Sequence, residues 1–217
     1  MVEFNLALVD AISLKDYSFS PHFYMLRDLI QAFIPLVLAF LIFTECKKRV
    51  DFLWWVLFFF FIIFLPNAPY TVGDITHFIG IYNKSYDKAY SAVVYIPFYF
   101  LYSFFCMEAF VLSLILFGRF LTKRGFNNYI ILMEILLILL SAFGILLGRF
   151  EGLYSWYIFT HPLLIFEAIK FSLSSLEVIL IYLAILCILF VLYYAVKLLD
   201  LKLYGYVLKI SKKDKIF

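Results

Sequence analysis

The chain has 217 residues, of which 66% are hydrophobic and 15% are charged, and its mean hydropathy is +1.01. Soluble domains are about 45–50% apolar and about 25% charged, so this composition excludes an ordinary soluble domain. The formal net charge of +3 gives no reason to expect a nucleic-acid partner. The lipid bilayer is therefore the expected surroundings of most of the chain.

Five apolar runs approach the length that crosses roughly 30 Å of hydrocarbon as a helix. We therefore expect an all-α, multi-pass helical membrane protein, residues 1–217 forming one integral membrane domain in the cell membrane. Short interfacial helices are expected beside the spans, one of them over residues 163–175. Trp54 and Trp55 are expected to anchor the second span at the membrane surface. The five spans are expected at about residues 26–43, 52–65, 92–117, 129–147 and 176–196.

The segment 65–77 interrupts this apolar pattern with two prolines, an asparagine, an aspartate and a histidine. Pro66 and Pro69 lack a backbone donor and are expected to end the second span. Asn67 between them is a good N-cap for a short helix over about residues 69–82. Broken backbone at membrane depth persists only where it is buried in protein or lines a water-filled cavity. The segment is therefore the expected floor of a pocket.

Lysine and arginine residues are divided unequally between the two ends of the expected spans. The poorer end holds Lys15, Arg27, Lys84, Lys88, Arg149 and Lys170. The richer end holds 12 of the 18, namely Lys47, Lys48, Arg49, Arg119, Lys123, Arg124, Lys197, Lys202, Lys209, Lys212, Lys213 and Lys215. Because the richer side is normally cytoplasmic, we expect the N-terminus outside and the C-terminus in the cytoplasm. Segments 65–77 and 148–161 then both lie at the outer face.

Two groups of residues in these segments carry a family resemblance. The first is Leu-Pro-Asn-Ala-Pro-Tyr at residues 65–70, followed by Asp74 and His77. The second is Gly148, Arg149 and Phe150, followed by Ser155 and Trp156. They resemble a family of predicted bacterial and archaeal integral membrane proteins, a domain of unknown function numbered thirteen sixty-one. Leu153, Tyr154 and Tyr157 stand where the family pattern has Trp, Asn and Asp. The resemblance implies this architecture and carries no established activity.

The candidate pocket draws on both segments and on Asp87, which resembles part of the family's aromatic–Asp pair before the third span. Asp74 and His77 are spaced i, i+3 and share one face of a helix. There they can bind a divalent metal, for which His161, Asp87 or Glu151 could supply further ligands, or act as a base and its orienting partner. In the structural alternative, Asp74 pairs with Arg149 or with a loop backbone, and His77 lies at the membrane interface. No cofactor can be named from the sequence. The candidate pocket residues are Asn67, Asp74, His77, Asp87, Arg149 and Trp156.

Three polar residues lie within the expected spans. Gln31 is expected to form an interhelical hydrogen bond. Glu108 is either a protonatable relay or ion ligand, or a neutral group bonded to Gln31 or to a tyrosine. Glu134 is expected to reach water or to pair with Arg119 or Lys123.

Small residues in the spans are expected to serve packing. Gly144 and Gly148 are spaced i, i+4 and permit close helix approach, although this spacing is common by chance. Cys46, Cys106 and Cys187 lie far apart without metal-ligand spacing, so we interpret them as small apolar fillers.

Two classes of function remain open. We favour a binding, transport or accessory protein that holds a small ligand or a membrane-protein partner in the outer pocket. The alternative is a membrane enzyme that acts on a lipid or lipid-linked anionic substrate through Asp74, His77 and Arg149. The loops supply few polar groups for catalysis, so an enzyme is the less favoured interpretation.

The division of basic residues predicts the topology. A reporter that works only outside the cytoplasm should be active when it is fused after Lys84 or after Tyr157. The same reporter should be silent after Lys123 and at the C-terminus. Activity after Lys123 would contradict this orientation.

Overall fold

The computed structural model describes residues 21–44, 50–71, 88–150, 152–153, 155 and 157–213. Within these residues the chain is helical and has no strand. The elements are α2 (Pro21–Phe43), α3 (Phe52–Phe64), α4 (Asn67–Tyr70), α6 (Lys88–Lys123), the 3-10 helix η2 (Asn127–Tyr129), α7 (Ile130–Phe150), α8 (Tyr157–Thr160), α9 (Pro162–Ser174) and α10 (Leu176–Lys213).

Five stretches are long and apolar enough to cross a membrane, which confirms the expected all-α class. The third and fifth extend beyond the expected ends, because neither Gly118 nor Lys197 breaks its helix. The five stretches are Met25–Phe43, Phe52–Tyr70, Ala92–Lys123, Asn127–Gly148 and Leu176–Leu203.

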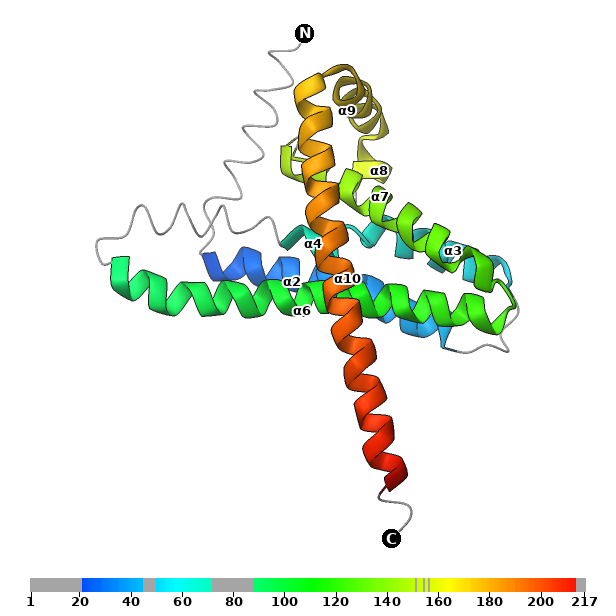
Figure 1. Cartoon of the computed structure of the whole chain (residues 1–217). Helices are drawn as coiled ribbons and strands as arrows, with labels where there is room; N and C mark the ends of the chain where they lie inside the picture. Colours follow the sequence, from blue (N-terminus) through cyan, green and yellow to red (C-terminus); the bar gives the residue numbers. More distant parts are fainter. Residues whose placement is uncertain are drawn as a thin grey trace.

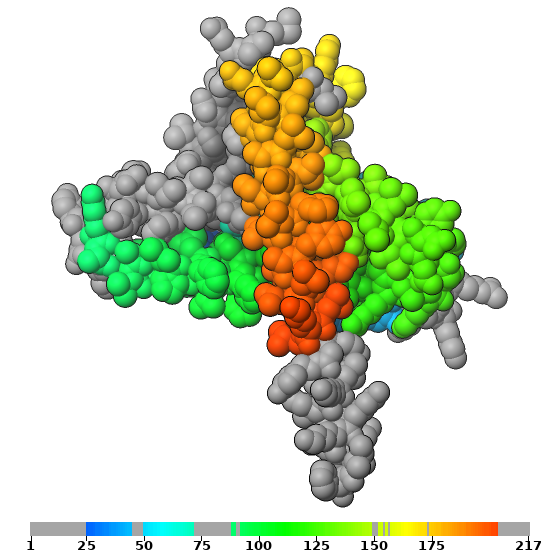
Figure 2. Space-filling model, in the orientation of Figure 1, coloured from blue at the N-terminus to red at the C-terminus, as the bar shows by residue number. Residues whose placement is uncertain are grey.

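The first four long helices alternate in direction (Figure 1). The end of α2, the start of α3 and the α6–α7 connection therefore lie at the same end of the molecule. At the α6–α7 connection, Gly125 adopts a φ of +82°, a left-handed conformation that glycine accepts without steric cost. α10 runs across α6 and α7, and its outer surface is uncovered in Figure 2.

α6 is the central helix of the packing. It packs against α2, α4, α7 and α10, and its most extensive contact is with α2. Cys106, Phe110, Val111 and Leu114 on α6 are fully buried. Half of the α6 span is buried, against 11% of the α10 span, and α6 provides more of the described core than any other helix.

An aromatic cluster fastens the end of α2 to α3 and α6. The Phe43 ring is 5.2 Å from the Phe61 ring, 5.1 Å from the Phe117 ring and 5.5 Å from the Phe120 ring. Trp54 stacks on Phe120 at 5.7 Å and donates its indole N–H to the carbonyl of Ile42. Trp54 is only 8% exposed.

The two tryptophans therefore differ, and the expectation that both are surface anchors was wrong for Trp54. Trp54 is part of the core because its one polar atom is satisfied inside the protein. Trp55 is 58% exposed, as an interfacial residue requires.

Polar contacts join α10 to α7. The Tyr182 hydroxyl donates to the carbonyl of Leu139 at 3.3 Å. The Lys197 ammonium lies 2.5 Å and 2.6 Å from the two carboxylate oxygens of Glu134, which is 2% exposed. The expected pairing of Glu134 with Arg119 or Lys123 was therefore wrong. α10 crosses α7 closely enough to bring Lys197 to Glu134. Lys197 therefore neutralises the Glu134 carboxylate, which does not need to reach water.

The Glu134–Lys197 pair predicts a double-mutant result. Glu134→Gln alone and Lys197→Met alone should each lower the free energy of unfolding by about 3–5 kcal/mol, because each leaves one buried charge unpaired. The double variant should recover much of that loss. Unfolding in detergent measures all three, and losses that simply add would show that the two side chains do not interact.

Candidate functional site

The chain is interrupted but not reversed after α3. Leu65, Pro66 and Thr71 all have right-handed helical dihedral angles, and the short helix α4 follows at once. The Leu65 N–H donates to Phe61 O at 2.9 Å and the Tyr70 N–H to Pro66 O at 3.2 Å. Local hydrogen bonds thus satisfy several of the backbone groups around the two prolines, as membrane depth requires.

Asn67 is not the N-cap that the sequence suggested. It is the first residue of α4, and Pro66 occupies the cap position without a side-chain hydrogen bond. The expected helix over residues 69–82 is described only as far as Thr71. The asparagine side chain is consequently available for contacts outside its own helix.

Two glycines on α7 leave room for this interrupted segment to pack against the helix. A Cβ atom added to Gly144 would lie 2.6 Å from both Cβ and Cγ of Pro66. A Cβ atom on Gly148 would lie 3.0 Å from Cε2 of Tyr70. The Gly144/Gly148 spacing therefore allows the proline and tyrosine side chains to approach the α7 backbone.

The chain returns to the same place after α7. Gly152 adopts a φ of +63°, and the Leu153 N–H donates to Leu147 O at 3.2 Å. This turn brings Ser155 to α4, where its hydroxyl donates to Oδ1 of Asn67 at 3.0 Å. Residues 88 positions apart therefore meet through one hydrogen bond.

The Asn67 amide nitrogen is the unsatisfied hydrogen-bond donor of this junction. It is buried and finds no acceptor within the part of the chain that the structure describes. A buried N–H donor without a partner costs roughly 1–3 kcal/mol. An acceptor on a bound molecule would remove that cost.

α6 adds a contact that the sequence did not reveal. Thr71 is fully buried, and its carbonyl accepts a hydrogen bond from the Ser103 hydroxyl at 3.3 Å. Its own hydroxyl donates to Ala68 O at 3.2 Å. Ser103 stands among aromatic and aliphatic residues of α6, and its small polar side chain was the only available signal.

The other expected pocket residues fall outside the description. Asp74, His77, Asp87 and Trp156 lie outside the described residues, and so does the side chain of Arg149 in the last turn of α7. The metal and ion-pair expectations that involve them therefore stay predictions.

His161 stands apart at the start of α9. It is exposed, its Nδ1 lies 2.9 Å from the Thr160 hydroxyl, and its ring contacts the Tyr157 ring at 5.3 Å. Among the described residues, no three His, Cys, Asp or Glu side chains gather as a metal site would require.

The hydrogen bonds expected for Glu108 are absent among the described residues. No hydrogen bond joins Gln31 to Glu108, although both residues are described. None joins the Glu108 side chain to a described tyrosine either.

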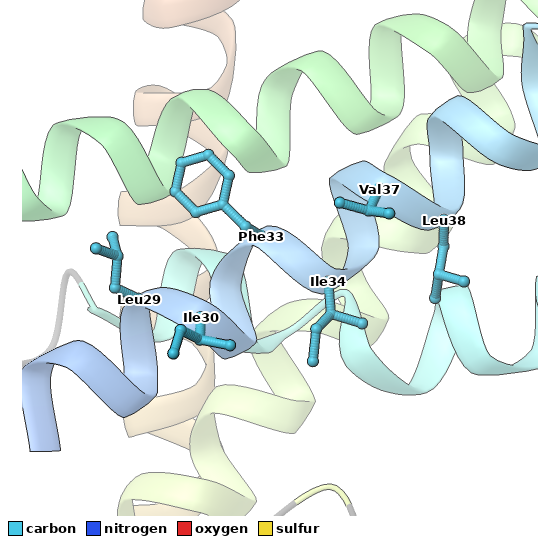
Figure 3. A pocket seen from close by; sticks show the side chains of 6 residues that line it. All are labelled: Leu29, Ile30, Phe33, Ile34, Val37 and Leu38. Carbon is cyan, nitrogen blue, oxygen red and sulfur yellow. The ribbon is translucent and has the colours of Figure 1, made fainter.

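A wholly apolar cavity of about 500 Å³ opens along α2 (Figure 3). It is separate from the Asn67–Ser155 junction and offers no polar group for chemistry. Its lining residues are Leu29, Ile30, Phe33, Ile34, Val37 and Leu38.

Comparison with known proteins assigns a family. Residues 28–192 match the family described as "Protein of unknown function (DUF1361)". Because the match covers most of the chain, the protein belongs to this family. No curated protein and no solved structure matches the chain.

The glycine contacts predict a graded series of stabilities. Gly144→Ala should destabilise by about 1–3 kcal/mol, because its Cβ would overlap the rigid Pro66 ring. Gly148→Ala should cost less, since the Tyr70 ring can shift by a few tenths of an ångström. Gly118→Ala is the control, because its nearest neighbour would be 3.5 Å away. Unfolding in detergent ranks the three variants, and equal losses at positions 118 and 144 would contradict the close approach.

Proposed function

We propose that this protein, whose family has no assigned activity, binds a small ligand where segments 65–77 and 148–161 meet. The protein would lie in the cell membrane with its N-terminus outside, so that this junction faces outward. The end of α2, the start of α3 and the α6–α7 connection share one end of the molecule, and the Arg119, Lys123 and Arg124 residues at that end support this orientation.

The observation that carries the proposal is the Asn67 carboxamide. Its oxygen is occupied by Ser155, whereas its buried nitrogen has no acceptor among the described residues. The backbone that carries Asn67 is held in place, because Pro66 packs against Gly144 and Tyr70 packs against Gly148. A rigidly held donor favours binding, since little conformational entropy is lost when a ligand accepts from it.

The chemistry of the junction favours binding over catalysis. The amide of Asn67 and the hydroxyl of Ser155 hold and orient a ligand through hydrogen bonds. The ligand class that fits the free nitrogen carries a hydrogen-bond acceptor, such as a carbonyl, carboxylate or phosphate oxygen. We therefore propose a binding, transport or accessory role.

Native mass spectrometry of the purified protein tests this proposal. Wild-type protein should retain a co-purified small molecule, and Asn67→Ala should lose at least tenfold of the bound fraction. Ser155→Ala should lose less, because it frees the amide oxygen but keeps the nitrogen donor. Ser113→Ala is the control, since this buried hydroxyl on α6 bonds only to the Ala109 carbonyl of its own helix.

Two outcomes would contradict the binding role. One is the same bound mass in Asn67→Ala as in wild type. The other is an equal loss in Ser113→Ala, which would attribute the effect to general damage. The unfolding temperature of each variant separates loss of ligand from loss of fold.

A further inference from the structure

The chain that follows α7 runs back along α4 and α3. Its described residues are Gly152, Leu153, Ser155 and those of α8 (Tyr157–Thr160), and we call them the return segment. The Leu153 N–H donates to Leu147 O near the end of α7, and the Ser155 hydroxyl donates to Asn67 of α4. The return segment therefore reaches α4 within a few residues of the end of α7.

α8 continues in the same direction and meets α3. The ring centre of Phe159 lies 5.9 Å from that of Phe60 and 6.4 Å from that of Phe59. These two residues of α3 precede Asn67 by about two helical turns. The successive contacts of the return segment thus move from α4 toward the middle of α3.

The position of Phe60 gives the depth that α8 reaches. Phe60 lies near the middle of the apolar stretch Phe52–Tyr70, which is long enough to cross a membrane. At 1.5 Å per residue, about 15 Å of helix separates Phe60 from Tyr70 at the end of this stretch. That distance is half of the roughly 30 Å of hydrocarbon in a bilayer. Because side chains of a helix lean toward its N-terminus, the rings of Phe59 and Phe60 lie slightly deeper than their backbone.

Two large apolar side chains of α8 are exposed at this depth. Ile158 is 39% exposed and Phe159 is 54% exposed. Phe59 of α3, whose ring neighbours that of Phe159, is 50% exposed. In water this continuous apolar surface would cost about 25 cal/mol per Å². In hydrocarbon the same surface carries no such cost.

The polar groups at the end of α8 have partners within the segment. Nδ1 of His161 lies 2.9 Å from the Thr160 hydroxyl. The His161 N–H donates to Tyr157 O at 2.8 Å, and the Leu164 N–H donates to His161 O at 3.1 Å. Internal hydrogen bonds of this kind are what an irregular segment needs at membrane depth.

α9 is long enough to bring the chain back to the surface. Its 13 residues extend for about 20 Å, which exceeds half the thickness of the hydrocarbon. Leu163 and Phe166 near its start are 78% and 68% exposed, and its charged residues Glu167 and Lys170 come later. α10 then begins at Leu176. The chain can therefore leave the membrane on the side where it entered.

We propose that the return segment and α9 form a re-entrant hairpin, which dips to the middle of the membrane beside α3 and presents Ile158 and Phe159 to lipid acyl chains. Acyl chains are the partner of this surface because it is continuous with the exposed apolar surface of α3 at Phe59. The hairpin adds no crossing of the membrane, so the sidedness of the other helices is unaffected. The Asn67–Ser155 junction then lies below the membrane surface, since α8 is deeper still.

Spin labels on the full-length protein in phosphatidylcholine vesicles test the depth of α8. In protein whose Cys46, Cys106 and Cys187 are replaced by alanine, Ile158→Cys and Phe159→Cys each receive one nitroxide label. Molecular oxygen collects in the middle of a bilayer, whereas a charged nickel chelate stays in water, and each relaxes the label on collision. Both labels should be accessible to oxygen and should lose nearly all accessibility to the nickel chelate.

Two labelled controls define the extremes of this measurement. Leu136→Cys carries an exposed label near the middle of the α7 span, and Phe126→Cys carries one in the exposed α6–α7 connection. The labels on α8 should match the first control. Nickel accessibility at both α8 positions equal to that at position 126 would overturn the proposal, since α8 would then lie in water. The labels do not involve Asn67, so failure here is distinct from failure of the proposed ligand site.

Discussion

The contact between Pro66 and the bare backbone of Gly144 is the constraint on which the half of the structure around α4 depends. Two prolines remove backbone donors inside an apolar chain, and the interruption is tolerated only if protein covers it. α7 provides this cover because it carries no side chain at position 144. With that contact formed, Tyr70 meets Gly148 and Asn67 meets Ser155.

The opposite end depends on aromatic packing. Phe43 and Trp54 fill the space between α2, α3 and α6 with rings in edge and stacked contacts. In a bilayer no hydrophobic effect drives apolar side chains from lipid into protein contacts, so close van der Waals packing must supply the attraction between helices. Large flat rings supply more of that contact than aliphatic side chains. The molecule thus has an aromatic end and a polar, proline-interrupted end.

Much of the fold could be predicted because lipid imposes length and hydropathy on each spanning helix. The runs that begin at Met25, Phe52, Ala92, Asn127 and Leu176 were therefore visible in the sequence. The end of the fifth helix was not, because Lys197 and Asp200 look like the start of an aqueous tail. The helix continues where Lys197 meets Glu134 on the neighbouring helix α7, a contact that a single sequence cannot show.

The site was only partly predictable, because a single sequence does not show which helices touch. Asn67 was recognised because an asparagine between two prolines is unusual in an apolar run. Its partner Ser155 and the neighbouring Ser103 depend on which helices touch, and hydroxyl groups are too common to mark such contacts. The glycine spacing on α7 was visible, but its function required knowing that Pro66 lies opposite.

The packing of α2 against α6 has a consequence for biogenesis. These helices form the most extensive helix pair, yet α3 and α4 separate them in the chain. The face of α2 that packs against α6 must therefore stay without its partner until α6 has been synthesised and inserted, although α3 and α4 can already pack against α2. Such delayed pairing is slow because its contacts are distant in sequence. An early intermediate with α2 and α3 inserted alone is the state in which we expect this protein to be most open to quality-control proteases.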